Sequence, residues 1–295
     1  MITRVTQQMM AQHSLTSMQG GLARLAKVQE QLSTGRVINR VSDSPADASA
    51  AMRLRGALVD QQQFARNAAD GAAWLNQADQ TLQSSVNQVR RARELAIQGA
   101  SSGSMSDQSR EALAAEVDQL REGLIATANS TYLDRPIFGG VTAGSQAFDA
   151  SGAYVGVNSP VLRAVADGVK VRVDVEGEAT FASTGTSVFD ELTALSTALR
   201  TNDTVGIRGQ IDVLKTHLDA MSTMQSNVGS RAKRVEQADV AAGDADLTLR
   251  TRLSEIENTD LAQATVDLKL QEVAYQAALA TTARVMQPSL VDFLR

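Results

Sequence analysis

Hydrophobic residues near the start of the chain recur at alternating intervals of three and four, the spacing that keeps an apolar seam on one side of an α-helix. This seam predicts a helix over residues 2–34 that ends at Gly35, because glycine tolerates the left-handed conformation that closes a helix. Gly20 and Gly21 interrupt the helix at a cost of up to about 1 kcal/mol each relative to alanine, so they mark a candidate hinge.

A strong helix start follows at Ser44. Ser44 can cap the helix, Pro45 fits its first position, and Asp47 lies near its positive end. The apolar seam that follows continues to Ala96 without a phase slip. A helix over residues 45–99 would be about 80 Å long, and it needs a partner helix because an isolated amphipathic helix is marginal in water.

The middle of the chain changes from helical spacing to alternation. A shorter helix is marked by apolar positions from Leu113 to Thr127, and the valines of residues 169–175 then alternate with charged residues, which predicts a half-buried strand. Tyr154–Val157 and Val161–Val165 are expected to supply neighbouring strands. Helical spacing then returns, and a seam from Ile207 to Val235 mirrors the first half.

These elements predict a mainly α protein. We expect a long antiparallel helical bundle or coiled coil formed by the N- and C-terminal halves, with a central β insertion. The predicted domains are the terminal helices at 1–40 with 256–295, a long helical core at 41–137 with 186–255, and a small β-rich domain at 138–185.

The last predicted helix differs from the others because apolar residues occupy two of its faces. Leaving so much apolar surface in water would forfeit on the order of 10 kcal/mol, so this helix is expected to drive assembly. The candidate assembly interface combines apolar residues of both ends: Leu15, Met18, Leu22, Leu25, Leu32, Leu261, Val266, Leu268, Leu270, Val273, Tyr275, Leu279, Met286, Leu290, Phe293 and Leu294.

Composition narrows the possible partners. Hydrophobic residues make up 43% of the chain and aromatic residues only 3%, so burial is expected to depend on Ala, Leu, Val and Met, which suits helix packing better than a ligand pocket. The net charge is −5 and no long basic block occurs, so nucleic acid is not an expected partner. No run of 18 apolar residues occurs, and the first thirty residues lack a signal-peptide pattern, so neither a membrane span nor a cleaved signal peptide is expected.

The sequence offers little catalytic chemistry. It contains no cysteine and two histidines, His13 and His217, both within helical patterns, and we expect them to be structural. Nucleotide, hydrolase and zinc-protease motifs do not occur, so no enzymatic activity, cofactor or metal is predicted. Trp74 is expected to pack in a core or an interface. Asn129 and Asn202 match the glycosylation motif, which is common by chance.

Several stretches resemble the flagellin superfamily. The family's N-terminal signature is resembled by the run QLSTGRVINRVSDSPADASAAMRLRGAL of this chain. The family's long first core helix is resembled by RNAADGAAWLNQADQTLQ, followed by VRRARELAIQGA. The family's C-terminal core is resembled by two further runs of this chain, VGSRAKRVEQ and TTARVMQPSLVDFLR. The resemblance covers residues 1–140 and 187–295 and leaves the β middle as the variable part.

Within the superfamily, the sequence resembles the branch that joins hook to filament more than the filament flagellins. The central GVKVRVDVEGEATF and the VDFLR ending also resemble that branch, whereas residues 137–140 suit both. The residues that match this branch lie just before and at the start of the long helix, and flagellins tend to lack the proline among them. They are Thr34, Gly35, Arg36, Ser42, Asp43 and Pro45.

The resemblance implies a structural part of the bacterial flagellum, outside the cell, whose terminal helices form the inner tube of the axial structure. It implies axial neighbours of two kinds, hook-associated protein 1 and flagellin, together with copies of the chain itself. It also implies passage through the flagellar type III export channel, with an export chaperone on the C-terminal segment. The mechanism would be mechanical, with the outer layers adapting the curved hook to the stiffer filament.

Three alternatives stay open at this stage. The first is a small filament flagellin. The second is a signalling coiled coil of the chemoreceptor type, which has a similar composition but needs no β insertion between its arms. The third is a membrane-active amphipathic protein, which is disfavoured because the apolar stripes lack flanking Lys/Arg and Trp anchors.

Overall fold

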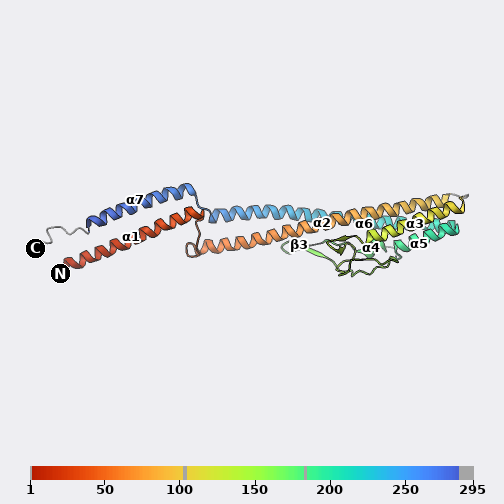
Figure 1. The fold of residues 1–295 in the computed structure, drawn as a ribbon, viewed down its shortest axis with the longest axis horizontal. Coiled ribbons are helices and arrows are strands. Elements are labelled where there is room, and N and C mark those ends of the chain that lie inside the picture. The colour runs from red at the N-terminus through yellow and green to blue at the C-terminus, as the bar shows by residue number, and fades with distance from the viewer. Residues whose placement is uncertain (1, 102–104, 183–184, 286–295) are drawn as a thin grey trace. The chain divides into compact units, whose positions relative to one another are not determined.

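The computed structural model of the chain describes residues 2–101, 105–182 and 185–285. As predicted, it consists mainly of helices with a small β-containing region (Figure 1). Its contacts define two compact units: unit 1 contains both ends of the chain, up to Val59 and from Asp246, and unit 2 contains residues 60–245. The three-part domain division predicted from the sequence stays a prediction.

Two long helices cross unit 2 side by side, α2 (Pro45–Ser101) and α6 (Thr204–Glu257). They run antiparallel, because the amide of Gln225 donates to Asp79 at 3.1 Å and Arg93 donates to the carbonyl oxygen of Ile211 at 3.2 Å. This arrangement confirms the predicted coiled coil. Every seventh residue of each seam is buried: Ala68, Leu75, Leu82, Val89 and Ala96 on α2, and Ile207, Leu214, Met221, Val228, Val235 and Ala242 on α6.

Two shorter helices complete the helical part of unit 2, α3 (Asp107–Ala128) and α5 (Val188–Thr201). Each begins at a serine whose side chain accepts a hydrogen bond from a backbone N–H of the first turn, at 3.2 Å for Ser106 and 3.1 Å for Ser187. The two helices pack against each other. Trp74 is 1% exposed and lies against the ring of Tyr132 at 5.4 Å, so it is a core residue.

The β-containing region is smaller than predicted. It has two antiparallel hairpins, β1 (Thr131–Tyr132) with β2 (Arg135–Pro136) and β3 (Leu162–Ala166) with β4 (Val169–Arg172), followed by the short helix α4 (Gly177–Phe181). The prediction of a strand over residues 154–157 was wrong, because Tyr154 and Val157 form only isolated bridges.

Alternation also misplaced Asp174, which the pattern puts on the polar side of a strand. Asp174 is fully buried, because its carboxylate accepts from the backbone N–H of Val161 at 2.7 Å and from Arg172 at 2.9 Å. Strand β4 ends at Arg172, and a bend follows at Asp174.

The expectation that aromatic residues contribute little to burial was also wrong for this region. Four of the six phenylalanines and one tyrosine form a connected cluster with ring centroids 5.1–5.6 Å apart. Such edge and stacked contacts add to the free energy of apolar burial. The members of the cluster are Phe138, Phe148, Phe181, Phe189 and Tyr154.

Unit 1 contains the first helix, α1 (Ile2–Thr34), and the last, α7 (Leu261–Val285), both close to their predicted bounds. They pair antiparallel: Arg24 donates to the side chain of Gln271 at 3.5 Å, and Gly21 faces the ring of Tyr275. The first turns of α1 and the last turns of α7 therefore lie at the same end of the pair (Figure 1).

Candidate assembly surface

The connection between α1 and α2 is tied to the chain segment between α6 and α7. The backbone N–H of Thr259 donates to the carbonyl oxygen of Gly35 at 2.9 Å, and that of Val37 donates to the carbonyl oxygen of Glu257 at 2.8 Å. Gly35 adopts a φ of 69°, the left-handed conformation expected for it from the sequence. These bonds hold the inner ends of the two terminal helices together.

Two carboxylates reinforce this junction. Asp43 accepts hydrogen bonds from the backbone N–H of Arg40 at 2.9 Å and lies 3.1 Å from the ammonium of Lys27, and these contacts, the backbone bond first, hold the pKa of Asp43 below its usual value. The Glu257 side chain is 8% exposed and its oxygen lies 2.6 Å from the guanidinium of Arg55. A buried carboxylate needs such a partner, so this pair fixes the end of α6 against α2 within unit 1.

Ser44 caps the N-terminal end of α2, as predicted from the sequence. The hydroxyl of Ser44 accepts from the backbone N–H of Asp47 at 3.4 Å and donates to the Asp47 carboxylate at 2.6 Å, and α2 begins at Pro45. Thr34 accepts from the backbone N–H of Arg36 at 3.3 Å. Most of the motif residues that suggested the family thus make the turn from α1 to α2.

The structure divides the predicted assembly residues into two sets. One set is half-buried in the α1–α7 pair, where the antiparallel register brings the two helices together. These residues stabilise the pair inside one chain. They are Met18, Leu25, Leu32, Leu268 and Tyr275.

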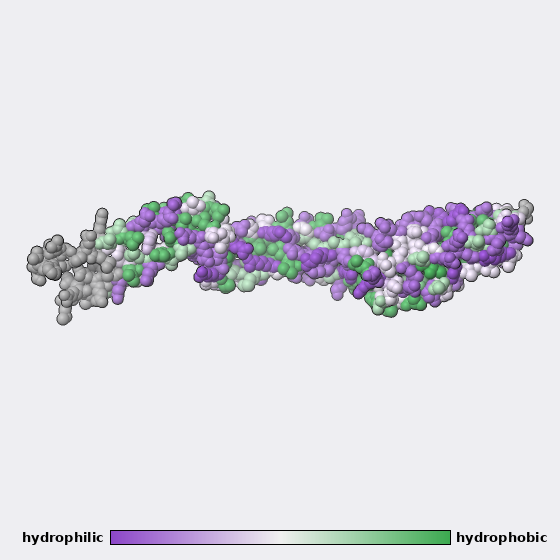
Figure 2. All heavy atoms as spheres, in the orientation of Figure 1, coloured by the Kyte–Doolittle hydropathy of each residue, from purple (hydrophilic) through white to green (hydrophobic). Residues whose placement is uncertain are grey.

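The second set points outward, with side chains 40–63% exposed. We call these exposed residues together the outward apolar face, which on α7 takes in more than one side of the helix: Leu15, Leu22, Leu261, Val266, Leu270, Val273 and Leu279. Figure 2 shows hydrophobic surface over the end of α7 that follows α6. The remaining four predicted residues, Met286, Leu290, Phe293 and Leu294, lie outside the described residues.

Unit 1 buries very little for its size. Among its described side chains, those that are buried are Ala48, Ala51, Leu58, Glu257 and Ala264. Unit 2 in contrast contains a continuous core with large aliphatic and aromatic side chains. Because stability comes mainly from apolar burial, unit 1 gains little from its own core.

Sequence reasoning missed several exposed apolar residues of unit 1, among them Met52 and Val59 on α2, which are 56% and 61% exposed. Their spacing of seven residues was the available signal, since it places them on one side of the helix. It was hidden by the stronger seam on the other side of α2.

The part of the chain that the structure describes offers no assembled catalytic centre. His217 is fully buried and burial lowers its pKa, whereas His13 is exposed. No group of metal-ligating side chains occurs among the described residues, and none of the described helices is long and apolar enough to cross a bilayer. Asn129 has its amide engaged internally, accepting from the N–H groups of Ala147 and Phe148 at 2.8 and 2.9 Å.

The fold and this surface define a class: a helical structural protein whose two ends pair and leave an apolar face uncovered. The family comparison agrees. Residues 5–139 match the bacterial flagellin N-terminal helical region, and residues 211–294 match the bacterial flagellin C-terminal helical region. The chain belongs to the flagellin superfamily, which confirms the resemblance found in the sequence motifs.

Relatives span nearly the whole chain. It is 24% identical over 317 residues to flagellar hook-associated protein 3 of Salmonella typhimurium, covering 99% of this chain and 100% of the relative. It is 26% identical over 264 residues to a flagellin of Halalkalibacterium halodurans, covering 88% of both. Among solved structures, Bacillus cereus FlgL is similar with a TM-score of 0.61 and 25% identity, covering 68% of this chain and 99% of that one. These relatives are structural proteins of the flagellum.

Proposed function

We propose that the chain is a junction protein between the hook and the filament of the bacterial flagellum, a structural part without enzymatic activity. The observation that carries the proposal is the outward apolar face, formed by helices from both ends of the chain. The end-to-end similarity to flagellar hook-associated protein 3 supports the junction rather than another place in the flagellum.

Covering the outward apolar face would release substantial free energy. Each of its seven side chains is about half exposed, so covering one is worth about 1 kcal/mol, and the whole face is worth on the order of 5–10 kcal/mol per subunit. Association costs part of this gain. Neighbouring terminal helices are the natural cover, because they present the same kind of surface.

The proposed neighbours follow from the resemblance. They are hook-associated protein 1 on one side, flagellin on the other, and copies of the chain around the axis, with an export chaperone on the C-terminal segment before assembly. The proposed route is type III export without a cleaved signal peptide. The proposed layout keeps the terminal helices at 1–40 and 256–295 innermost, the helical core around them, and residues 138–185 outermost.

A filament flagellin is the second candidate, and the similarity to the Halalkalibacterium halodurans flagellin favours it. The location of the protein separates the two. Gold-labelled antibody against the chain should mark only the base of each filament for a junction protein, and the whole filament for a flagellin. The chemoreceptor-like alternative is disfavoured by the family membership and by the β-containing region between the helical halves.

The assembly role is tested by making the face polar. Leu270→Gln with Val273→Gln changes two side chains that are 61% and 63% exposed, so the free monomer should keep its fold. In cells lacking the native chain, this variant should be exported but should not support filaments or swimming. Val205→Gln is the matched control, because Val205 is 79% exposed but lies in unit 2. Normal filaments from the double variant would refute the proposal.

A further inference from the structure

The hairpin formed by β3 and β4 is fastened to α2. The side-chain amide of Asn67 donates to the backbone carbonyl oxygen of Ala164 at 2.7 Å. The guanidinium of Arg163 donates to the Asp70 carboxylate at 2.7 Å and lies 5.9 Å from the centroid of the Trp74 ring. Asn67, Asp70 and Trp74 are three and four residues apart along α2, so they lie on one side of the helix and present it to the hairpin.

The same hairpin also reaches α6. The guanidinium of Arg231 on α6 donates to the backbone carbonyl oxygen of Asp174, two residues after the end of β4, at 3.1 Å. Gly71 on α2 marks the point where the three elements meet. A Cβ on Gly71 would lie 3.2 Å from a methyl carbon of Val173 and 3.8 Å from a methyl carbon of Val235 on α6. The hairpin therefore bridges the two long helices of unit 2 instead of lying on one of them.

The seam between α2 and α6 is poor in large side chains where the hairpin crosses it. Over residues 60–73 of α2, the buried residues are Ala68 and Gly71. Over the facing stretch of α6, they are Val235 and Ala242. Such small residues bury little apolar area, so by themselves they contribute little free energy to the pairing of the two helices.

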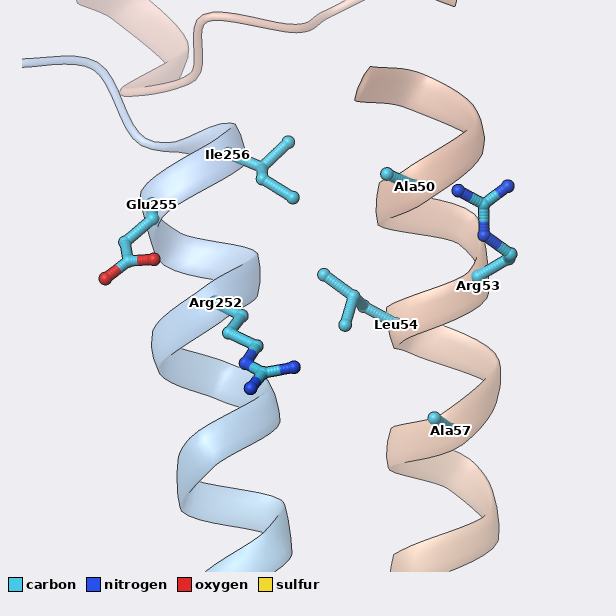
Figure 3. A pocket seen from close by; sticks show the side chains of 7 residues that line it. All are labelled: Ala50, Arg53, Leu54, Ala57, Arg252, Glu255 and Ile256. Carbon is cyan, nitrogen blue, oxygen red and sulfur yellow. The ribbon is translucent and has the colours of Figure 1, made fainter. Parts of the chain in front are cut away.

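The part of the two helices that lies in unit 1 has no such third element. Figure 3 shows a groove there between the first turns of α2 and the last turns of α6, with Leu54 and Ile256 among the residues that line it. Its volume is about 610 Å³. In unit 2, by contrast, Val173 of the hairpin segment is fully buried and fills the space beside Gly71. The hairpin thus supplies the apolar contact that the seam lacks.

We propose that residues 162–174, which we call the hairpin strap, are a conformational lock that holds α6 against α2. The Arg163 and Asp70 side chains are 28% and 30% exposed, so this anchor can open without exposing the buried core of unit 2. When it opens, residues 60–70 of α2 and 236–245 of α6 lose their shared support and separate together. The inference goes beyond the proposed function, because the lock acts within one monomer, wherever the protein lies in the flagellum.

The lock is tested by breaking one anchor and restoring it in the same protein. Asp70→Cys with Arg163→Cys replaces the ion pair by two thiols on facing side chains, and the chain has no other cysteine. Hydrogen exchange of the monomer is measured before and after treatment with a short bifunctional thiol reagent. Before treatment, amides of residues 236–245 should exchange about tenfold faster than in the native chain, because a charge-assisted hydrogen bond to the strap is lost. Crosslinking should return them to within about twofold of the native rate.

Lys170→Ala is the matched control, because Lys170 is an exposed residue of the same hairpin. Its side chain has no ion pair or hydrogen bond within the described residues, so its loss should leave the exchange rates unchanged. Acceleration confined to residues 162–174 in the untreated cysteine variant would overturn the inference, since the hairpin would then be a separate attachment to α2. So would fast exchange in α6 that crosslinking does not slow, because the lost side chains and not the lost strap would then be its cause.

Asn67→Ala is a milder second variant, since it removes one hydrogen bond and leaves the ion pair in place. It should accelerate exchange at residues 236–245 about threefold. Residues 82–96 of α2 should keep their native rates, because a hydrogen bond from Gln88 to Thr127 at 3.1 Å ties this stretch to α3. If the cysteine variant does not fold, Asn67→Ala decides alone. Native rates at residues 236–245, or equal acceleration over both stretches, would overturn the lock.

Discussion

Replacing Arg55 with alanine tests whether the Arg55–Glu257 pair holds the inner ends of the terminal helices together. The substitution leaves the Glu257 carboxylate, 8% exposed, without its cation. Breaking a fully buried pair costs about 3–5 kcal/mol. The Arg55 side chain is 49% exposed, so solvent screens the pair and we expect a loss of about 1–2 kcal/mol.

Two backbone amides report this loss directly. The N–H groups of Val37 and Thr259 donate across the junction, at 2.8 and 2.9 Å, so they exchange with solvent when the junction opens. We expect their hydrogen exchange to accelerate about 5- to 30-fold in Arg55→Ala, the factor that corresponds to 1–2 kcal/mol. The fluorescence of Trp74, the single tryptophan, should not change, because it is buried in unit 2.

Substitutions at Arg55 and Glu257 should not have additive effects on stability. Glu257→Gln removes the buried charge itself, so it should cost less than Arg55→Ala, and the double variant should be less destabilised than the sum of the two. Arg250→Ala is the control, since Arg250 forms an exposed pair with Asp246 within one helix and should cost at most about 0.5 kcal/mol. Unchanged exchange at Val37 and Thr259 in Arg55→Ala would refute the proposed role of the pair.

Three further predictions concern stability. Gly140→Ala places a Cβ 2.2 Å from a backbone carbonyl oxygen at a φ of +60°, so it should lower the free energy of unfolding of unit 2 by about 2–4 kcal/mol, measured with urea and Trp74 fluorescence. Gly168→Ala, at a φ of +67° with open space, should cost about 1 kcal/mol, and equal losses would contradict the steric argument. Burial lowers the pKa of His217 below the ordinary histidine value of about 6.5, so stability should be full above that pH and fall as the pH drops through it, because the unfolded chain then binds the proton more tightly. His217→Gln should flatten this slope between pH 7 and 5, and a slope identical to that of the native chain would contradict the assignment. Gly21→Ala should increase the helix content of unit 1, measured by circular dichroism, and stabilise α1 by up to about 1 kcal/mol, because its Cβ meets the nearest ring at an ordinary 3.5 Å; a loss of helix would show that the position needs glycine.

The helices could be predicted because their positions show in the local spacing of apolar residues and in the capping residues. The buried heptads of α2 and α6 are visible as spacing, and the start of α2 is visible as Ser44 followed by Pro45. Helix ends depend on residues next to each other in sequence, so no long-range information was needed.

The β-containing region resisted prediction because its determinants are distant in sequence. Asp174 is buried because of a hydrogen bond from Val161, and no periodicity encodes that pairing. The phenylalanine cluster likewise joins four positions spread from Phe138 to Phe189. The low aromatic content is an average over the whole chain, whereas the clustered aromatic side chains lie together in the β-containing region.

The sequence identified the two helices that carry the assembly surface, but not which face of each helix points outward. Leu268 and Leu270 are equally apolar, yet Leu268 is half-buried against α1 and Leu270 is 61% exposed. A helix that is apolar on two faces can present either face to its partner. Only the antiparallel register with α1, fixed by contacts such as Arg24 with Gln271, decides which face stays outward.

The contrast between the two units gives the outward apolar face its significance. Unit 2 closes a core around Trp74 and the α2–α6 seam, so it can fold without a neighbour. Unit 1 has a fixed junction at Arg55–Glu257 but leaves most of its large apolar side chains in water. In the free monomer this apolar surface is in contact with water, which is unfavourable until other helices cover it. The free energy missing from unit 1 as a monomer is thus the free energy available to hold an assembly together.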